Sequence, residues 1–324
     1  MNTLLEILNL KRPHGGRNEV YIGQHLMSQM PMEFETSYND KGQVMAYIYT
    51  TDEESNTLFV AHLDTVHNDE AAVNPVQYDQ ELGIMYKTDG TALGADDGAG
   101  VWLLFEMMKA GVKGTFMYTV GEERGGVGAR WVADNCSGFM REFDRAIAFD
   151  RAGTKDVITH QGWGRCCSDD FAQALSDKLN VSGFEYRPDD TGVYTDTAEW
   201  VALIPECTNI SCGYASQHSG NETQDVDFLF TLRDVCLELD WDSLPVSRDP
   251  AVEDKWTSWR NETSHEIMSF DDIMRMDDED IYDYVYQNPD AVAEMLIDTK
   301  GGGGSYEVAA QDKAWSWFYG EEMK

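Results

Sequence analysis

Between residues 57 and 240 the sequence alternates short apolar runs with longer segments whose apolar residues follow a helical pattern. Short apolar runs bounded by polar residues are typical of buried strands, and their alternation with helices is typical of a parallel sheet covered by helices. The predicted strands are 57–61, 115–120, 146–149 and 208–212, and the predicted helices are 99–109, one that begins at Ser168, and 225–239. The pattern therefore predicts an α/β fold with a largely parallel central sheet.

Side chains that can ligate metal ions lie at or just after the ends of predicted strands, or in the turn that opens a predicted helix. They are His62 with Asp64, Asp96, Glu122 with Glu123, Asp150, and His218. Taken singly, each has an ordinary structural explanation, such as a cap or a surface pair. Open α/β sheets, however, place their binding sites at the carboxyl ends of strands. The ordered set therefore predicts one metal site at that edge of the sheet.

The residue types in these segments suit hydrolytic metal chemistry. His62 can ligate an ion through one ring nitrogen while Asp64, two residues on, accepts the other N–H and fixes the tautomer. Asp96 lies in a glycine-flanked turn, where a carboxylate can bridge two cations. Glu122 and Glu123 are adjacent in a loop, so one can ligate and the other can act as a general base.

These motifs resemble those of the di-zinc exopeptidase superfamily, which contains metallo-aminopeptidases, carboxypeptidases, dipeptidases, tripeptidases and deacylases. The local matches are residues 62–66, 93–100 and 121–123, and the first two look most like the peptidase T branch. The resemblance covers residues 57–222 and leaves out the acidic C-terminal part.

The resemblance implies a role for each matched residue. Asp96 would bridge two Zn²⁺ ions, for which Co²⁺ or Mn²⁺ could substitute. His62 and Asp150 would complete one site, and Glu123 and His218 the other. Glu122 would be the general base for a metal-bridging water, and Asp64 would orient His62. The implied fold is a three-layer sandwich with a mixed, mostly parallel central sheet, and the implied activity is cleavage of a peptide bond by an exopeptidase.

The spacing of these segments argues against the inserted domains of many superfamily members. His62 and Asp96 are only 34 residues apart, and the 68 residues from Asp150 to His218 must already supply a helix and strands of the main sheet. We therefore expect a compact catalytic domain without a lid.

Charge and the missing lid favour an aminopeptidase that acts on short peptides. The net charge is −35, and an acidic cleft attracts a free α-amine. A dipeptidase, a tripeptidase or an N-acyl amino acid deacylase is the alternative, with Arg151 or Arg165 as the anchor for a substrate carboxylate. The segment around Thr195 resembles a Thr-Asp turn of related aminopeptidases, so Tyr194 and Asp196 are candidate pocket residues.

The same composition argues against other classes of partner. A strongly acidic surface repels nucleic acid and anionic lipid, and no apolar run reaches the roughly 20 residues of a membrane helix. The six cysteines lack CxxC spacing, which favours free thiols in a reducing cytoplasm. A hypothesis from a different class is a catalytically inactive scaffold that binds a partner through its acidic surface.

Composition also divides the chain. We expect the catalytic domain in residues 1–240, an acidic and mostly helical extension in 241–300, a Gly/Ser linker in 301–305 and an aromatic tail in 306–324. From residue 237 onward there are 22 Asp and Glu against 7 Lys and Arg. The tail could dock on its own domain or on a partner, and the sequence leaves the oligomeric state open.

Overall fold

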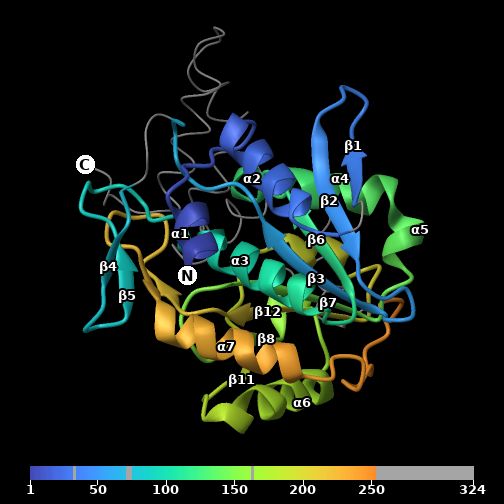
Figure 1. The fold of residues 1–324 in the computed structure, drawn as a ribbon. Helices are drawn as coiled ribbons and strands as arrows, with labels where there is room; N and C mark the ends of the chain where they lie inside the picture. Colours follow the sequence, from blue (N-terminus) through green and yellow to red (C-terminus); the bar gives the residue numbers. More distant parts are fainter. Residues whose placement is uncertain (32–33, 71–74, 162–163, 253–324) are drawn as a thin grey trace, which may run out of the picture. The chain divides into compact units, whose positions relative to one another are not determined.

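The four strands at the centre of the main sheet run parallel, and further strands on both sides make the sheet mixed (Figure 1). The spatial order is β1-β2-β6-β3-β7-β12-β8-β11. The strands are β1 (Glu35–Tyr38), β2 (Val44–Thr50), β3 (Thr57–His62), β6 (Thr115–Thr119), β7 (Arg145–Arg151), β8 (Asp156–Ile158), β11 (Arg187–Asp189) and β12 (Glu206–Ser211). The four apolar runs predicted as strands are the central strands β3, β6, β7 and β12, so the predicted α/β class is confirmed.

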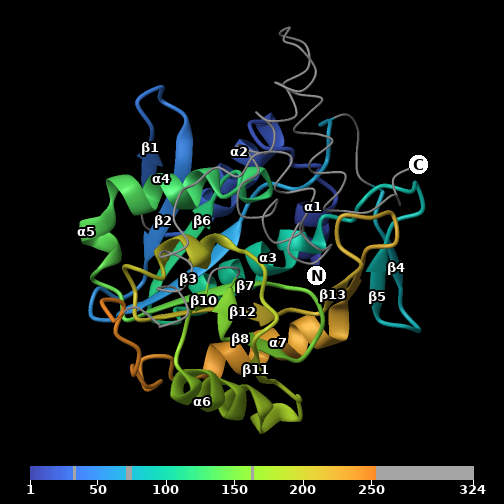
Figure 2. The same cartoon turned by 180° about the vertical axis from the view of Figure 1, so that it is seen from behind.

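Helices cover both faces of this sheet because its central strands are apolar on both faces. On one face Phe59 and Phe116 stack on each other and belong to the core that also contains side chains of α1, α2, α3, α6 and α7. On the other face Val60 and Met117 pack with α4 and α5. The first set of helices is α1 (Asn2–Leu8), α2 (Arg17–Ser28), α3 (Ala95–Ala110), α6 (Asp169–Leu179) and α7 (Val226–Glu238). The second set is α4 (Val127–Asn135) and α5 (Ser137–Met140), seen best from behind in Figure 2.

Helix boundaries follow the predicted signals. Regular helical geometry in α3 starts after Asp97, because Asp96 and Asp97 have non-helical backbone angles. The helix then matches the predicted segment 99–109 and is buried almost all round. Ser168 caps α6 by accepting the N–H of Phe171.

A smaller four-stranded sheet lies beside the start of α3, and its order is β13-β14-β5-β4. Its strands are β4 (Gln77–Asp79), β5 (Ile84–Tyr86), β13 (Tyr214–Ala215) and β14 (Thr223–Asp225). A two-stranded sheet pairs β9 (His160–Gln161) with β10 (Gly164–Arg165), and the 3₁₀ turns are η1 (Glu122–Arg124), η2 (Asn180–Ser182) and η3 (Asp196–Trp200). The β13–β14 connection carries His218, so the small sheet brings that residue to the end of the large one.

The structure is a computed structural model that describes residues 1–31, 34–70, 75–161 and 164–252. These residues belong to one compact unit, Met1–Thr257. Trp241 and Leu244 are buried in its core, so the chain stays packed on this unit beyond the predicted boundary at residue 240. Most of the predicted extension (241–300), the linker (301–305) and the tail (306–324) lie outside the described residues. Every helix among the described residues is too short or too polar to span a bilayer.

Candidate metal centre

The five predicted ligands come together at the carboxyl edge of the central strands. His62 is the last residue of β3, and Asp150 lies near the end of β7. Glu123 lies in η1, which follows β6 closely, and Asp96 lies at the start of α3. His218, in the β13–β14 connection, has a left-handed backbone with φ of 61°, which is unusual outside glycine and occurs often at functional sites.

The first ligand cluster consists of His62, Asp96 and Asp150, whose ligand atoms all lie within 4.8 Å of one another. The Nε2 atom of His62 lies 3.1 Å from Asp96 Oδ1 and 3.5 Å from Asp150 Oδ1. Its other ring nitrogen, Nδ1, lies 3.2 Å from the backbone oxygen of Asp64 and 3.4 Å from Asp64 Oδ1. Both neighbours are acceptors, so they favour a proton on Nδ1 and leave Nε2 to ligate.

The second cluster consists of Asp96, Glu123 and His218, again within 4.8 Å. His218 Nε2 lies 3.1 Å from Asp96 Oδ2 and 2.9 Å from Glu123 Oε1. The two oxygens of Asp96 therefore face different histidines, Oδ1 towards His62 and Oδ2 towards His218. The two clusters share this one carboxylate, which is the arrangement that a bridging ligand requires.

Asp64 has a wider role than the sequence suggests. Besides its contact with His62, its carboxylate accepts the N–H of Glu122 at 3.0 Å and of Glu123 at 3.2 Å. It thereby connects the end of β3 to the loop after β6. One buried side chain thus helps to orient both a predicted ligand and the predicted general base.

Glu122 lies next to the first cluster. Its Oε2 atom is 4.0 Å from His62 Nε2, and its side chain is 12% exposed. Burial raises the pKa of Glu122 well above its ordinary value, and the nearby charges of Asp150 and Glu123 add to this effect. A carboxylate with a raised pKa, beside the ligands but outside both clusters, is suited to take up and release a proton.

Carboxylates outnumber cations in this region. Burial and the charge of Asp96 raise the pKa of Glu123 to about 7, and the same two causes raise the pKa of Asp150. Although burial opposes it, contact with Asp96 and Glu123 raises the pKa of His218 to about 11. Glu123 Oε1 is buried, and it lies 2.9 Å from His218 Nε2. Two divalent cations would compensate this surplus of negative charge and use that oxygen as a ligand, so the residues present fit such ions.

Three polar groups hold Asp150, and none of them was predicted to do so. Thr195 Oγ1 donates to its Oδ2 at 2.7 Å, and the Tyr214 hydroxyl donates to its Oδ1 at 3.1 Å. Asn209 on the neighbouring strand β12 accepts the N–H of Asp150 and donates to its carbonyl oxygen. Asp150 is therefore positioned by both its backbone and its side chain.

The ligand loops are also held by residues without a local sequence signal. Asp97 accepts the N–H of His62 at 3.1 Å through Oδ2 and the N–H of Gly100 at 3.0 Å through Oδ1. Glu222 accepts backbone N–H groups of the turn that carries Asp96. Arg12 is fully buried and donates to backbone oxygens of both ligand loops. In these contacts with the ligand loops, Glu222 and Arg12 are between 51 and 128 residues away from their partners in the sequence.

The candidate pocket residues have defined partners. The Tyr194 hydroxyl donates to Glu199 Oε1 at 2.9 Å, and burial raises the pKa of Tyr194. Asp196 is buried and accepts a hydrogen bond from the hydroxyl of Thr119. Burial raises the pKa of Asp196 to about 7. The Tyr194 hydroxyl also lies close to Gly126, in the loop that follows Glu122, and Asp196 contacts the last residue of β6.

Both candidate carboxylate anchors already pair with acids. Arg151 contacts Asp156 at 3.2 Å and Asp189 at 3.9 Å, and Arg165 contacts Asp169 at 2.6 Å. These local pairs weaken the case for either arginine as an anchor for a substrate carboxylate.

One further cluster, His14 with Glu19 and Asp64, escaped the sequence analysis. His14 Nδ1 lies 3.1 Å from Glu19 Oε1, and Glu19 also accepts the N–H of Gly15 and of Gly121. Because these backbone groups occupy the Glu19 carboxylate, its evident role is to hold the N-terminal loop against the loop of Glu122.

The connection from Asp150 to His218 contains no inserted domain among its described residues. It supplies β8, β11 and β12 to the main sheet and α6 to the layer that covers it. The expected compact domain without a lid agrees with this topology.

Comparison with protein-family models and with curated proteins gave no match. Comparison with solved structures gave many. A tripeptidase from Staphylococcus aureus matches with a TM-score of 0.59 at 15% identity, over 73% of this chain and 95% of that one. The aminopeptidase PepT from Bacillus cereus matches with a TM-score of 0.56 at 14% identity, over 73% and 95%. The TET1 peptidase of Pyrococcus horikoshii matches with a TM-score of 0.52 at 16% identity, over 73% and 97%. The chain therefore shares its fold with these peptidases.

Proposed function

We propose that this protein is a co-catalytic two-zinc aminopeptidase that acts on short peptides. The observation that carries this proposal is the position of Asp96, whose two carboxylate oxygens face His62 and His218 and join two three-residue clusters. Glu122 lies beside the shared centre without belonging to either cluster. The fold shared with an aminopeptidase and a tripeptidase supports the same conclusion.

The donor set favours zinc. Each cluster offers one imidazole nitrogen and two carboxylates, a combination that suits Zn²⁺ and that Co²⁺ or Mn²⁺ can also accept. His62 and Asp150 would hold one ion, Glu123 and His218 the other, and Asp96 both. Bound ions of this kind polarise a scissile carbonyl and allow water to act as a nucleophile at neutral pH.

The chain's own groups would move the protons. Glu122 would take a proton from the attacking water and deliver it to the leaving amine. Its buried position beside the predicted ligands suits both steps, because the group that accepts the proton must then reach the leaving amine. Asp64 would keep the base in place through the N–H groups of Glu122 and Glu123.

The charge distribution supports an N-terminal specificity. The chain carries a net charge of −35, and an acidic surface around the centre would attract the free α-amine of a peptide. Arg151 and Arg165 are engaged in local ion pairs, which makes recognition of a substrate carboxylate by either one less favourable. A dipeptidase or tripeptidase is the second candidate, supported by the fold shared with a tripeptidase, and an N-acyl amino acid deacylase is a third.

The remaining expectations belong to the same proposal. Cysteine usage predicts a cytoplasmic location, and the acidic surface predicts that nucleic acid is not a ligand. The TET1 peptidase of Pyrococcus horikoshii can assemble into a tetrahedron or a large octahedral shell, so an assembly of several copies is a hypothesis for this chain as well.

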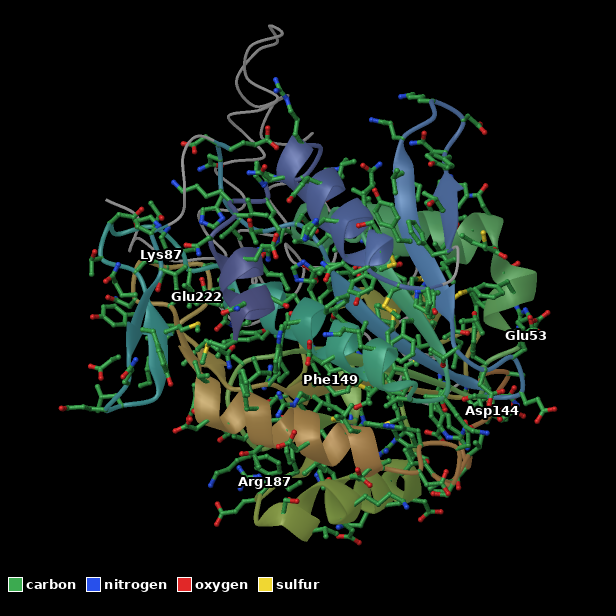
Figure 3. All side chains as sticks on the ribbon, viewed as in Figure 1. Glu53, Lys87, Asp144, Phe149, Arg187 and Glu222 are labelled. Atoms are coloured by element: carbon green, nitrogen blue, oxygen red, sulfur yellow. The ribbon has the colours of Figure 1, made fainter. Side chains whose placement is uncertain are left out.

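The test is the Glu122→Gln variant of the full-length protein. Wild type should contain about two zinc ions per chain by elemental analysis and release nitroaniline from aminoacyl-nitroanilides in a chelator-sensitive way. Glu122→Gln should keep both ions and lose about 10²- to 10⁴-fold in kcat, the usual contribution of a general base. Glu53→Gln is the matched control, since Glu53 is exposed and precedes the start of β3, whereas His62 is at the other end of that strand. Figure 3 shows Glu53 on the opposite side of the molecule from Glu222, and the activity of this variant should equal that of wild type.

Other results would redirect the assignment. Unchanged activity in Glu122→Gln would refute the assigned mechanism. Two zinc ions without nitroaniline release would favour dipeptides or N-acyl amino acids as substrates. A protein that binds no zinc even when zinc is added would favour the inactive scaffold.

A further inference from the structure

Glu222 makes an unusual set of hydrogen bonds to the turn that carries Asp96. Its Oε1 accepts the N–H of Ala95 at 2.8 Å and of Asp96 at 3.0 Å, and its Oε2 accepts the N–H of Gly94 at 3.0 Å. Glu222 is 2% exposed, so solvent does not compete for these bonds. A single buried carboxylate therefore satisfies three consecutive backbone donors of one turn.

The segment that supplies Glu222 also supplies a predicted ligand. His218 lies four residues earlier and contacts Asp96 Oδ2 at 3.1 Å. The short segment 218–222 thus contacts Asp96 twice, at its side chain through His218 and at its backbone through Glu222. Figure 3 shows Glu222 on the side of the molecule where the β4–β5 hairpin lies.

The turn is held from the other side as well. Arg12 Nη2 donates to the carbonyl oxygen of Gly94 at 3.1 Å. Gly94 has a left-handed backbone with φ of 79°, so the turn has a defined shape that these contacts maintain. With its N–H groups held by Glu222 and its carbonyl group held by Arg12, the backbone before Asp96 has little freedom to rotate.

We propose that Glu222 is a positioning residue that fixes the bridging carboxylate of Asp96 and couples the two metal sites. This proposal rests on the two-metal function proposed above. The orientation of the Asp96 backbone decides whether its two oxygens face both clusters at once. Loss of the Glu222 contacts would free the turn, so affinity should fall at both sites and not at one alone.

Two variants separate positioning from a plain charge effect. Glu222→Gln keeps the size of the side chain but replaces one acceptor oxygen with a donor group. Glu222→Asp keeps the charge but is one methylene shorter, so its oxygens do not reach all three N–H groups. If charge alone mattered, Glu222→Asp would behave like wild type.

Glu206 provides a matched control elsewhere in the fold. It is a fully buried glutamate that accepts the backbone N–H of Ser168, Ser247 and Arg248. It lies at the start of β12, whereas the ligand edge is at the strand ends. Glu206→Gln therefore repeats the same chemical change at a site that holds no predicted ligand.

The experiment combines two measurements on the full-length proteins. Amide hydrogen exchange of the metal-free proteins should show faster exchange at residues 94–96 in both Glu222 variants, and at 168, 247 and 248 in Glu206→Gln. Competition with a zinc chelator should show that zinc binds about 10- to 100-fold more weakly in both Glu222 variants. Glu206→Gln should bind zinc as wild type does.

Three results would overturn the proposal. Unchanged exchange at residues 94–96 in both Glu222 variants would show that the carboxylate does not hold the turn. Faster exchange with unchanged zinc affinity would show that the turn does not position Asp96. Wild-type zinc affinity in Glu222→Asp, with weak binding in Glu222→Gln, would assign the effect to charge. Zinc binding by the wild type is measured before any variant is compared. If the wild type does not bind zinc, both the proposed function and the proposed coupling of the two metal sites by Glu222 are refuted.

Discussion

Arg12 shows how much one side chain can contribute to the geometry of a site that it does not enter. Its guanidinium donates to the carbonyl oxygens of Leu63 and Ile7 at 2.7 Å and of Gly94 at 3.1 Å. Burial lowers its pKa to about 10, and the carboxylates around it oppose that effect, so the charge persists at neutral pH. Arginine suits this position because its planar group offers five donors. It connects the N-terminal helix to both ligand loops.

Replacement of Arg12 by Met should therefore destabilise the metal-free protein. The carbonyl oxygens would lose a buried donor, and each unsatisfied group costs about 1–3 kcal/mol, so we expect a loss of at least about 3 kcal/mol in the free energy of unfolding. Urea titration followed by circular dichroism measures it.

The control for this prediction is Arg130→Met. Arg130 is 61% exposed and pairs with Glu199, and such surface pairs contribute about 0–1 kcal/mol. If Arg12→Met lowers the free energy of unfolding by no more than this control does, the carbonyl oxygens find other hydrogen-bond donors.

At the scale of elements, α3 is the helix on which the centre depends. It begins with the turn of Asp96 and packs on β3 and β7, which end in other predicted ligands. A Cβ atom on Gly100 would lie 2.4 Å from Asp97 Oδ1 and 2.7 Å from the carbonyl oxygen of Phe149. Glycine at this position therefore allows the helix to approach the end of β7, next to Asp150.

Gly100→Ala should lower both stability and zinc affinity, although alanine is the better helix former. The helix preference favours alanine by about 0.5–1 kcal/mol, but the contacts with Asp97 and Phe149 would force a shift that costs about 1–3 kcal/mol. We expect a net loss in thermal unfolding and weaker zinc binding in a chelator competition.

Gly138→Ala in α5 is the matched control, because a Cβ atom there meets nothing within 4 Å. This substitution should leave zinc binding unchanged and stability equal or slightly higher. Equal stability of Gly100→Ala and wild type would mean that α3 and β7 are less closely packed than the structure shows.

At the scale of the whole molecule, the predicted domain boundary at residue 240 can be tested by truncation. The Trp241 ring packs edge-on against Phe59 at 5.0 Å between ring centroids. Arg145, at the start of β7, donates to the carbonyl oxygens of Asp242 and Leu244. These contacts bind the segment after α7 to the core of the unit Met1–Thr257.

A chain of residues 1–257 should therefore keep the zinc content, activity and unfolding midpoint of the full-length protein. A chain of residues 1–240 should be strongly destabilised, because it loses Trp241 and the partners of Arg145. Calorimetry and elemental analysis of both chains check this. Equal stability of the two would place the boundary at 240, and loss of activity in 1–257 would give the acidic C-terminal part a role in catalysis.

Local signals made the main features predictable. The long apolar runs became the central strands, because a strand buried on both faces must be apolar along its length. The ligands His62, Glu123 and Asp150 could be proposed in advance because each follows such a run closely. The short strands β4, β5, β8 and β11 have three residues each, which is too few to show a periodic pattern, and they were not predicted.

By itself, the sequence of this protein predicted the fold class from its apolar runs, and it predicted the candidate ligands from side-chain type and from their place after strands or in turns. The tertiary structure alone decided how those ligands are held. Glu222 and Gly94 are 128 residues apart, and Arg12 and Gly94 are 82 apart. No local sequence pattern predicts contacts of this kind, because a buried hydrogen bond depends on where the folded backbone brings its donor and its acceptor.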